Sequence, residues 1–315
     1  MPELLVLDHA AVLAAVPAAT AIEATRTAFL RHHRGEWVMP PKVYLDSPPY
    51  GDFRAMPARG DGVALLKWVT SFPGNAARGL PTVNGIVCLS DATTGLPQAL
   101  LDAPAVTALR TGAVAAVASV ALARPGASSV GIIGCGPNGS WAARCMAAAG
   151  YGPGVCADSR ADVAEALAAQ LGWQAGDRAA ALACDIVCTI TPGAQIVIDI
   201  GDLRPGMHLN MLGADGSGKA EAGIEAVVAC DLFCDEWEQA SHGGELAGAV
   251  HAGLVSSDQV TPLGAVLAGD MEGRRDDDAV TLFDSTGLAI QDLAVAAAAL
   301  EVAREGGVPV GRLRL

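Results

Sequence analysis

The sequence predicts an α/β protein in which a parallel-sheet domain is inserted into an α+β domain. The chain has 315 residues, enough for about two domains, and 51% of them are hydrophobic while 17% are charged. Strand-like runs separated by turns occupy residues 42–102, and short apolar runs alternate with helical segments from residue 130 onward. A last helical segment follows Asp284, where this alternation is complete, so we expect it to return to the first domain.

Composition and charge exclude several classes of protein. The formal net charge is −14, whereas a nucleic-acid-binding surface needs a basic patch, so we expect no nucleic-acid partner. The most apolar stretch, Thr111 to Ala123, has 13 residues, fewer than the roughly 20 of a membrane span, so no membrane partner is expected. Met1 to Ala10 has acids and no basic segment, unlike a signal peptide. The eight cysteines include no C-x-x-C pair, so we expect reduced thiols, no metal site and a cytoplasmic protein.

The first domain is expected to be an antiparallel sheet with a helix packed on it. One Ala-rich helix is predicted over residues 10–34 and another over residues 104–123, which ends before Pro125-Gly126. Ser90 to Gly95 lies between two strand-like runs and predicts a hairpin turn. The predicted strands are residues 42–45, 51–56, 63–70, 83–89 and 96–102.

The second domain is expected to be a parallel sheet with helices on both faces. Its apolar runs are short and continuous, as is typical of strands that are buried on both sides. Helices are predicted from the glycine-rich turn after residue 134 to Ala149, over residues 161–171, and at the end of the chain over about residues 290–305. The predicted strands are residues 130–134, 155–157, 185–191, 208–214, 227–235 and 279–284.

A glycine pattern follows the first strand of the parallel sheet. Gly134, Gly136 and Gly139 form G-x-G-x-x-G between that strand and a helix, and Asp158 ends the next strand. In this context the pattern is the dinucleotide-binding fingerprint of a Rossmann domain, because glycines let the backbone approach a pyrophosphate and the acid accepts hydrogen bonds from ribose hydroxyls. Asp158 would repel a 2′-phosphate, so NAD is predicted over NADP, although Arg160 could reach such a phosphate. An ordinary glycine-rich loop is the alternative.

Four cations lie inside apolar segments of the first domain, namely Lys42, Arg54, Lys67 and Arg110. Lys67 stands in a strand whose neighbours are residues of buried types, and burial favours the neutral amine, which suits proton transfer. Cations that converge on one pocket would bind a small carboxylate. Solvated charges on helices and edge strands are the alternative, because surface positions are the default for Lys and Arg.

Two polar segments follow strands of the parallel sheet, where ligands of open α/β sheets bind. Asp215 is predicted to end a strand, with Lys219 in the glycine-rich turn after it, and is a candidate acid/base group. A structural turn aspartate is the alternative. Ser285 and Thr286 precede the last helix, so either could cap it or contact a ligand.

Segments along nearly the whole chain resemble one family. These segments, which occur in the same order as in the family, resemble the ornithine cyclodeaminase/mu-crystallin family. Within it they are most similar to the archaeal-type alanine dehydrogenases. The matching segments are residues 39–45, 51–57, 66–69, 73–75, 79–83, 108–112, 133–136, 213–216, 242–245 and 283–292.

The resemblance implies roles for individual residues. Lys42 and Arg54 would bind the substrate carboxylate, Lys67 would be the proton donor beside the reacting carbon, and Asp215 would be the general acid/base. Arg110 would lie where substrate and cofactor meet, and Thr286 would contact the substrate. The residues implied to bind the dinucleotide are Thr82, Arg110, Gly134, Gly136, Pro137, Asn138, Gly139, Asp158, Arg160, Thr189 or Thr191, Leu212, Lys219 and Ser285.

The implied function is NAD-dependent reductive amination of a small 2-oxo acid with ammonia, through an imine, and the reverse oxidative deamination. We expect a homodimer with a substrate-binding and dimerisation domain of residues 1–117 and 292–315, and an inserted NAD-binding Rossmann domain of residues 118–291. Arg54 stands where ornithine cyclodeaminases have an acid, and Gly216-Ser217 stand where they have Cys-Pro, which disfavours a diamino acid. An ornithine cyclodeaminase, a ketimine or imino-acid reductase, and a non-catalytic NAD(P)-binding protein like mu-crystallin are the alternatives.

Overall fold

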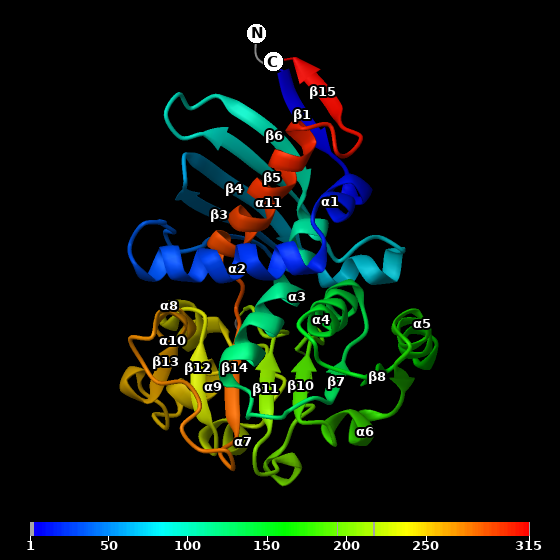
Figure 1. Cartoon of the computed structure of the whole chain (residues 1–315), viewed down its shortest axis with the longest axis vertical. Helices are drawn as coiled ribbons and strands as arrows, with labels where there is room; N and C mark the ends of the chain where they lie inside the picture. The colour runs from blue at the N-terminus through cyan, green and yellow to red at the C-terminus, as the bar shows by residue number, and fades with distance from the viewer. Residues whose placement is uncertain (1–2, 194, 217, 315) are drawn as a thin grey trace. The chain divides into compact units, whose positions relative to one another are not determined.

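The chain folds into two compact units. The computed structural model describes residues 3–193, 195–216 and 218–314. The first unit is Met1–Arg110 with Leu288–Leu315, and the second is Thr111–Gly287, so the second is inserted in the first along the chain (Figure 1). Both boundaries lie nearer the N-terminus than the expected 117/118 and 291/292. The first falls inside one continuous helix, α3 (Ala103–Leu122).

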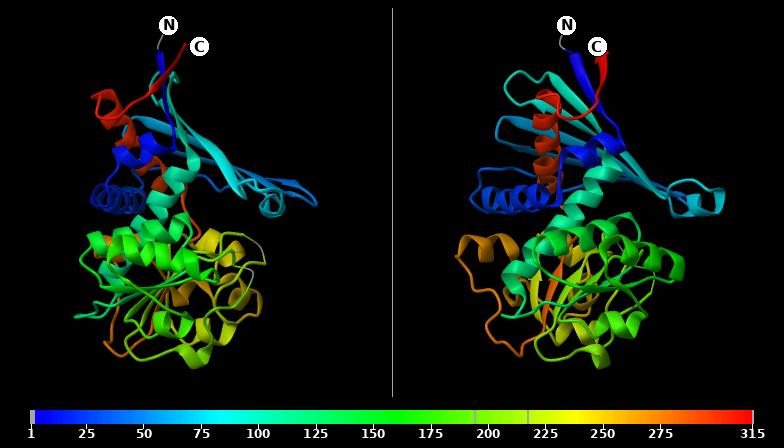
Figure 2. Two further views of the ribbon diagram at one scale, coloured as in Figure 1. Left: turned by 90° about the vertical axis from the view of Figure 1, so that its right-hand side faces the viewer. Right: turned by 45° about the vertical axis from the view of Figure 1, so that its right-hand side comes forward.

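A seven-stranded sheet forms the first unit, in the order β15-β1-β6-β5-β4-β3-β2. The expected antiparallel sheet is only partly right, because β1 pairs with β6 in parallel and neither β1 nor β15 was predicted. β4 and β5 form a long hairpin with the 3-10 helix η1 (Pro73–Arg78) at its tip (Figure 2). The strands are β1 (Glu3–Leu7), β2 (Val43–Ser47), β3 (Gly51–Gly60), β4 (Val63–Ser71), β5 (Val83–Asp91), β6 (Pro97–Asp102) and β15 (Gly311–Arg314).

The single helix predicted over residues 10–34 is wrong. The structure has α1 (His9–Ala15) and α2 (Ala18–His33), with Val16 in an extended conformation between them. Pro17 causes the break, because a proline clashes with a helical residue before it and cannot donate a backbone hydrogen bond. Asp8 caps α1 by accepting a hydrogen bond from the Ala11 backbone N–H at 2.9 Å.

The two faces of the β3–β4–β5 region differ. The inner face contacts α11 (Ala289–Arg304), and alternate residues of β3 and β4 are buried there. The outer face exposes large apolar side chains, with Trp68 stacked on Phe53 at 5.6 Å between ring centroids. The buried inner-face residues are Arg54, Met56, Ala58, Leu65, Lys67 and Val69, and the exposed apolar residues of the outer face are Val43, Leu45, Leu66, Trp68 and Ile86. Two charged side chains are therefore buried among apolar ones on the inner face.

An eight-stranded parallel sheet forms the second unit, in the order β13-β12-β14-β11-β10-β7-β8-β9. Successive strands run outward from β7 through β8 to β9, and then in the opposite direction from β10, as in doubly wound folds. The strands are β7 (Val130–Ile133), β8 (Gly154–Ala157), β9 (Gln174–Ala175), β10 (Ile186–Thr189), β11 (His208–Met211), β12 (Asp231–Cys234), β13 (Val260–Pro262) and β14 (Thr281–Asp284). The predicted 227–235 strand is too long, because Val227 and Val228 end a helix.

The remaining helices of the second unit connect these strands. They include α4, which follows the glycine pattern, and α5, which has the predicted bounds. They are α4 (Pro137–Ala148), α5 (Ala161–Leu171), α6 (Arg178–Leu182), η2 (Ile200–Asp202), α7 (Ile224–Val228), α8 (Trp237–Gly243), α9 (Ala247–His251), η3 (Ser257–Gln259) and α10 (Leu263–Ala268).

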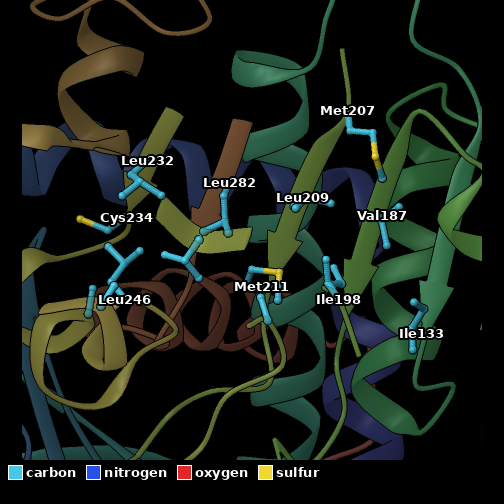
Figure 3. Close-up of a cluster of buried hydrophobic side chains, with 14 of the residues drawn as sticks. Ile133, Val187, Ile198, Met207, Leu209, Met211, Leu232, Cys234, Leu246 and Leu282 are labelled. Atoms are coloured by element: carbon cyan, nitrogen blue, oxygen red, sulfur yellow. The ribbon is translucent and has the colours of Figure 1, made fainter. Parts of the chain in front are cut away.

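The core of the second unit is built from alternate residues of adjacent parallel strands (Figure 3). Val187 of β10, Leu209 of β11 and Leu282 of β14 are completely buried. Strands buried on both faces need such continuous apolar runs, which is why the sequence predicted them.

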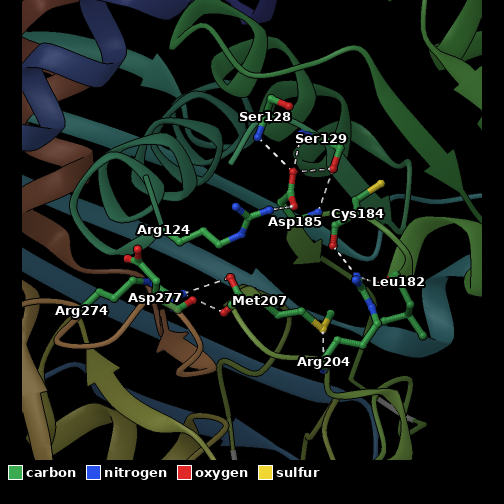
Figure 4. Close-up of polar contacts among 11 residues, drawn as sticks. Arg124, Ser128, Ser129, Leu182, Cys184, Asp185, Arg204, Met207, Arg274 and Asp277 are labelled. Carbon is green, nitrogen blue, oxygen red and sulfur yellow. Dashed lines mark hydrogen bonds and ion pairs between the residues drawn. The ribbon is translucent and has the colours of Figure 1, made fainter. Parts of the chain in front are cut away.

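Polar contacts join the amino ends of β7 and β10 (Figure 4). The Asp185 carboxylate accepts hydrogen bonds from Arg124 at 2.6 Å, from the Ser128 N–H at 3.1 Å and from the Ser129 hydroxyl at 2.8 Å. Burial opposes ionisation here, but these hydrogen bonds lower the pKa of Asp185 to about 2. An ionised carboxylate therefore ties the loops at this end of the sheet.

The length argument against a membrane span does not hold for α3, because the helix begins at Ala103 rather than near Thr111. α3 has 20 residues, and most of its apolar length is buried inside the structure. By length and composition alone such a helix could cross a membrane, but a buried core helix passes the same test. All eight cysteines are free thiols.

Candidate functional site

Lys67 is buried at the centre of the inner face of the first unit. Its side chain is 2% exposed, and its register partners are Met56 on β3 and Val87 on β5. The Nζ donates hydrogen bonds to Thr107 Oγ1 at 2.6 Å and to Asp292 Oδ1 at 2.9 Å. The structure therefore places the predicted lysine as a buried, hydrogen-bonded ammonium rather than a solvated surface charge.

Asp292 and Thr107 were not predicted as site residues. Asp292 lies in the first turn of α11, and its side chain is 0% exposed. Thr107 lies on α3, one turn before Arg110, whose Nε is 3.5 Å from Asp292 Oδ1. A single charged residue in the otherwise uncharged run of residues 285–300 was the signal that could have identified Asp292.

Arg54 lies on the inner face one diagonal step from Lys67, since its direct partner across β3–β4 is Val69. Asp52 holds its guanidinium through two hydrogen bonds, from Nε at 2.6 Å and from Nη2 at 3.3 Å. The guanidinium also lies 5.4 Å from the ring centroid of Tyr44 on β2. These contacts give the arginine a fixed orientation, as planar bidentate recognition of a carboxylate requires.

The other predicted residues of the first unit are more exposed. Lys42 is half-buried and directly precedes β2, which pairs with the strand that carries Arg54. Thr82 is exposed in the loop before β5, and its carbonyl accepts a hydrogen bond from the Phe72 N–H at 2.8 Å. Thr82 is thus the one predicted dinucleotide residue, besides Arg110, that belongs to the first unit.

The glycine-rich loop of the second unit connects β7 to α4. A Cβ on Gly139 would lie 1.8 Å from the Gly134 carbonyl oxygen, and Gly134 itself has φ +98° with a Cβ position 2.5 Å from the Ile190 carbonyl oxygen. A Cβ on Gly136, by contrast, would meet no protein atom within 4 Å. The protein backbone therefore requires glycine at the first and third positions, and the second leaves space for a ligand to approach.

The amino end of α4 lies in this loop. Gly136 is its N-cap without a side-chain hydrogen bond, Pro137 is exposed at its first position, and Asn138 is half-buried. Free N–H groups at such an end bind phosphate oxygens. The loop thus fits the pyrophosphate of a dinucleotide.

Asp158 follows β8 and joins it to the glycine-rich loop. Its carboxylate accepts hydrogen bonds from the Cys135 N–H at 2.7 Å and from the Arg160 N–H at 2.9 Å. The exposed Arg160 side chain lies alongside, with Nε 3.9 Å from Asp158 Oδ1. An acid held in this position beside the loop fits the ribose-binding role expected for it.

A buried carboxylate that was not predicted, Glu221, ties the ends of β10 and β11. It accepts hydrogen bonds from the Thr189 hydroxyl at 2.7 Å, the Thr191 N–H at 2.7 Å and the Gly213 N–H at 2.8 Å. Leu212 is also buried in this junction. Thr189 is completely buried with its hydroxyl directed to Glu221, whereas Thr191 is half-buried, so Thr191 is the better placed of the two to contact a ligand.

Asp215 lies in the loop after β11 rather than at the strand end, since β11 ends at Met211. It forms an ion pair with Lys219 at 2.5 Å, and both side chains are partly exposed. Ser217, between them, lies outside the described residues.

The segment after β14 is held by Asp235, which was not predicted. The Asp235 carboxylate accepts hydrogen bonds from the Ser285 hydroxyl at 3.3 Å, the Thr286 hydroxyl at 3.1 Å and the Gly287 N–H at 2.9 Å. Neither Ser285 nor Thr286 caps α11, because the N-cap is Leu288. The Ser285 N–H donates to the carbonyl that ends β11, so this segment adjoins the strand that precedes Asp215.

Two further buried carboxyls, Glu245 and Asp284, lie near these segments. Glu245 accepts hydrogen bonds from the Glu221 N–H at 2.9 Å and the Ala222 N–H at 2.6 Å, and burial raises its pKa to about 7. Burial and the neighbouring Asp235 carboxylate raise the pKa of Asp284 well above its usual range. Both carboxyls therefore hold protons at pH values where surface carboxyls are ionised.

Glu245 makes stability depend on pH. Folding raises the pKa of Glu245 from 4.5 to about 7. The contribution of this carboxyl to the free energy of unfolding is therefore fully present below pH 4.5 and is lost as the pH rises through 7. We expect Glu245→Gln to remove about 2.5 kcal/mol of the decrease in unfolding free energy between pH 5 and 8. Urea unfolding of the wild type and the variant at several pH values measures this. If the unfolding free energies of the wild type and the variant changed with pH in parallel, Glu245 would be ionised in the folded state and the prediction would be wrong.

Comparisons with known sequences agree with these observations. A model of the ornithine cyclodeaminase/mu-crystallin family matches residues 3–307. The chain is 40% identical to an alanine dehydrogenase of Archaeoglobus fulgidus over 301 residues, which are 93% of each chain. It is 36% identical to an iminosuccinate reductase of Paracoccus denitrificans over 245 residues, which cover 75% of this chain and 76% of the relative.

Solved structures give the same result. An archaeal alanine dehydrogenase dimer with bound NAD has a TM-score of 0.94 at 38% identity, with both chains covered completely. The iminosuccinate reductase with NAD+ has a TM-score of 0.90 at 29% identity, again with both chains covered completely. A Thermococcus litoralis Δ1-pyrroline-2-carboxylate reductase with NADH and L-proline has a TM-score of 0.92 at 27% identity over 99% of this chain and 100% of that one.

The similarities confirm the expected fold class, an α/β protein with a Rossmann domain, and the expected class of enzyme, an oxidoreductase acting on amino acids or imines. This chain therefore belongs to the ornithine cyclodeaminase/mu-crystallin family.

Proposed function

We propose that this protein is an NAD-dependent amino-acid dehydrogenase that converts a small 2-oxo acid and ammonia to the amino acid, and catalyses the reverse oxidative deamination. One observation carries the proposal. A completely buried lysine, Lys67, shares the inner face of one sheet with a buried arginine, Arg54, in a protein whose net charge is −14. Buried cations in such a protein call for an anionic ligand and for proton chemistry.

Arg54 and Lys42 bind the substrate carboxylate in this proposal. Asp52 holds the Arg54 guanidinium from one side, and Tyr44 lies against it, so the arginine is oriented before the substrate arrives. The guanidinium would repel the second ammonium of a diamino acid, which favours a small monoamino acid over ornithine. The family members named alanine dehydrogenase support this choice.

Lys67 and Asp215 move the protons. Ammonia adds to the keto carbon while Lys67 Nζ donates a proton to the carbonyl oxygen. The Asp215 carboxylate takes a proton from the added nitrogen and passes it to the hydroxyl, which leaves as water and gives the protonated imine. When bound, the nicotinamide of NADH supplies the hydride that reduces the imine. Lys67 regains its proton from solvent after the turnover, and Arg110 and Thr286 contact the substrate.

The second unit binds the dinucleotide. The glycine-rich loop and the amino end of α4 hold the pyrophosphate, and Asp158 accepts the ribose hydroxyls, which favours NAD over NADP. Relatives whose structures contain NAD or NADH support the same choice. The residues proposed to contact the dinucleotide are those given by the resemblance, with Thr191 in preference to Thr189.

The apolar outer face of the first unit is the proposed homodimer interface. Leu66, Trp68 and Ile86 on adjacent strands are 45%, 36% and 51% exposed, respectively. A contiguous patch of this kind on a soluble protein marks an association surface, and the similar alanine dehydrogenase is a dimer. The eight free thiols suit a reducing compartment, so we place the protein in the cytoplasm.

An NADH-oxidation screen tests the function. We expect oxidation with a small 2-oxo acid such as pyruvate only when ammonium is present, and release of the corresponding amino acid. Ornithine converted to a cyclic product without net change in NADH would instead identify a cyclodeaminase. NADH binding without turnover across 2-oxo acids, imino acids and ornithine would contradict an enzymatic role.

Reduction of a preformed imine is the second candidate function. The relatives that are 36% and 33% identical to this chain include an iminosuccinate reductase and a Δ1-pyrroline-2-carboxylate reductase, and their names describe this reaction. In the screen, a preformed cyclic imine reduced without ammonium, at a higher kcat/KM than any 2-oxo acid with ammonium, would favour this alternative.

A further inference from the structure

Asp292 has no part in the reaction as derived above, yet it is the completely buried partner of Lys67. It lies four residues into α11, where the positive end of the helix favours a carboxylate. A buried carboxylate is costly unless cations pair with it. Its position therefore calls for a role in the site of the first unit.

We infer that Asp292 is a positioning residue, which keeps Lys67 protonated and fixes the direction of its ammonium for proton delivery. The delivery of a proton by Lys67 is part of the proposed function, and in this respect the inference rests on that function. The pairing itself rests only on contacts within the first unit.

The geometry fixes the ammonium group. Lys67 Nζ donates one hydrogen bond to Asp292 Oδ1 at 2.9 Å and another to Thr107 Oγ1 at 2.6 Å. Because the three N–H bonds of an ammonium are tetrahedral, fixing two of them also fixes the direction of the third. The Thr107 hydroxyl donates to the Ala103 carbonyl at 2.8 Å, so its oxygen is left to accept from the lysine.

The charges explain why a carboxylate is needed. Lys67 contacts Asp292 of α11 and Thr107 of α3, Arg110 of α3 lies 3.5 Å from the same Asp292 oxygen, and Arg54 stands one diagonal step away on β3. Asp52 already pairs with Arg54. Removing Asp292 takes away the carboxylate that pairs with the lysine while the guanidinium of Arg110, which contacts the same oxygen, remains, so we expect the lysine to lose its proton at lower pH.

Asp292→Asn tests this inference, because asparagine keeps an oxygen acceptor and removes the charge. In reductive amination, where Lys67 must be protonated, we expect the alkaline limb of the kcat profile to move to lower pH by about one to three pH units. KM for the 2-oxo acid should change little, because Arg54 and Asp52 are untouched. A kcat that decreases equally at every pH, or an unchanged profile, would overturn the inference.

Thr107→Val is the matched control. It removes the other hydrogen bond to the same ammonium without altering any charge. We expect the alkaline limb of this variant to move by less than half as much as that of Asp292→Asn. Equal shifts in the two variants would show that hydrogen bonding rather than charge governs Lys67, and would overturn the inference.

A melting-temperature cycle examines the pairing without turnover. Lys67→Met and Asp292→Asn should each lower the melting temperature, because each breaks the buried Lys67–Asp292 ion pair, and the double variant should recover most of the loss. Additive losses would overturn the pairing. A wild type that shows no turnover in the NADH screen would overturn the proposed function, while the melting cycle would still decide the pairing.

Discussion

Lys67→Met is expected to lower kcat for reductive amination by about 10²–10⁴-fold, the contribution typical of a positioned general acid. Because Lys67 is completely buried on the inner face, neither solvent nor a surface side chain supplies the proton once the lysine is removed. NADH affinity should stay near the wild-type value, since the glycine-rich loop belongs to the second unit. Steady-state NADH oxidation and NADH fluorescence titration measure the two effects.

Loss of folding must be separated from loss of chemistry in this variant. Lys67→Met leaves the more distant Arg110, 3.5 Å from Nε to Oδ1, as the cation that pairs with the buried Asp292 carboxylate among the described residues. The double variant Lys67→Met/Asp292→Asn removes this uncompensated charge and should be as inactive as the single variant although it is more stable. Wild-type turnover in either variant would show that Lys67 does not supply the proton.

Gly136→Ala and Gly139→Ala should differ in their effect on stability, although both change the glycine-rich loop. At Gly139 a Cβ would lie 1.8 Å from the Gly134 carbonyl oxygen, so alanine should cost about 1–3 kcal/mol or more of unfolding free energy. At Gly136 a Cβ meets no protein atom within 4 Å, so alanine should change stability by no more than about 1 kcal/mol.

The Gly136→Ala variant is the sharper test of the two for the dinucleotide site. Its added methyl group would occupy the space through which the pyrophosphate approaches, so we expect the Kd for NADH to rise about tenfold or more, which is at least about 1.4 kcal/mol. Calorimetric titration with NADH and urea unfolding of both variants measure this. Wild-type affinity in a stably folded Gly136→Ala variant would place the pyrophosphate elsewhere.

Features that depend on neighbours along the chain could be predicted from the sequence. The glycine pattern, its strand and helix, and Asp158 lie within 30 residues of one another, and the structure joins Asp158 to the Cys135 N–H of the loop. Lys67 was identified by a single charge among strand residues of buried types. Continuous apolar runs predicted the central parallel strands, although their ends were placed up to four residues too far.

Contacts that depend on topology could not be predicted in the same way. Lys67 and Asp292 are separated by 225 residues, and only the return of α11 to the first unit brings them together. Glu221 is 30 residues from Thr191 and follows a loop rather than a strand, so no periodic pattern of apolar residues in the sequence pointed to it. β1 and β15 pair the two ends of the chain, which no local pattern indicates.

Isotope transfer from NADH tests the central claim most directly. The wild-type protein would be incubated with NADH carrying deuterium at C4 of the nicotinamide, in the stereochemical form that is oxidised, together with ammonium and the best 2-oxo acid of the screen. We predict an amino acid with one deuterium at Cα and an equal amount of NAD+. An amino acid without deuterium at Cα, or no amino acid despite bound NADH, would contradict the assignment as an amino-acid dehydrogenase.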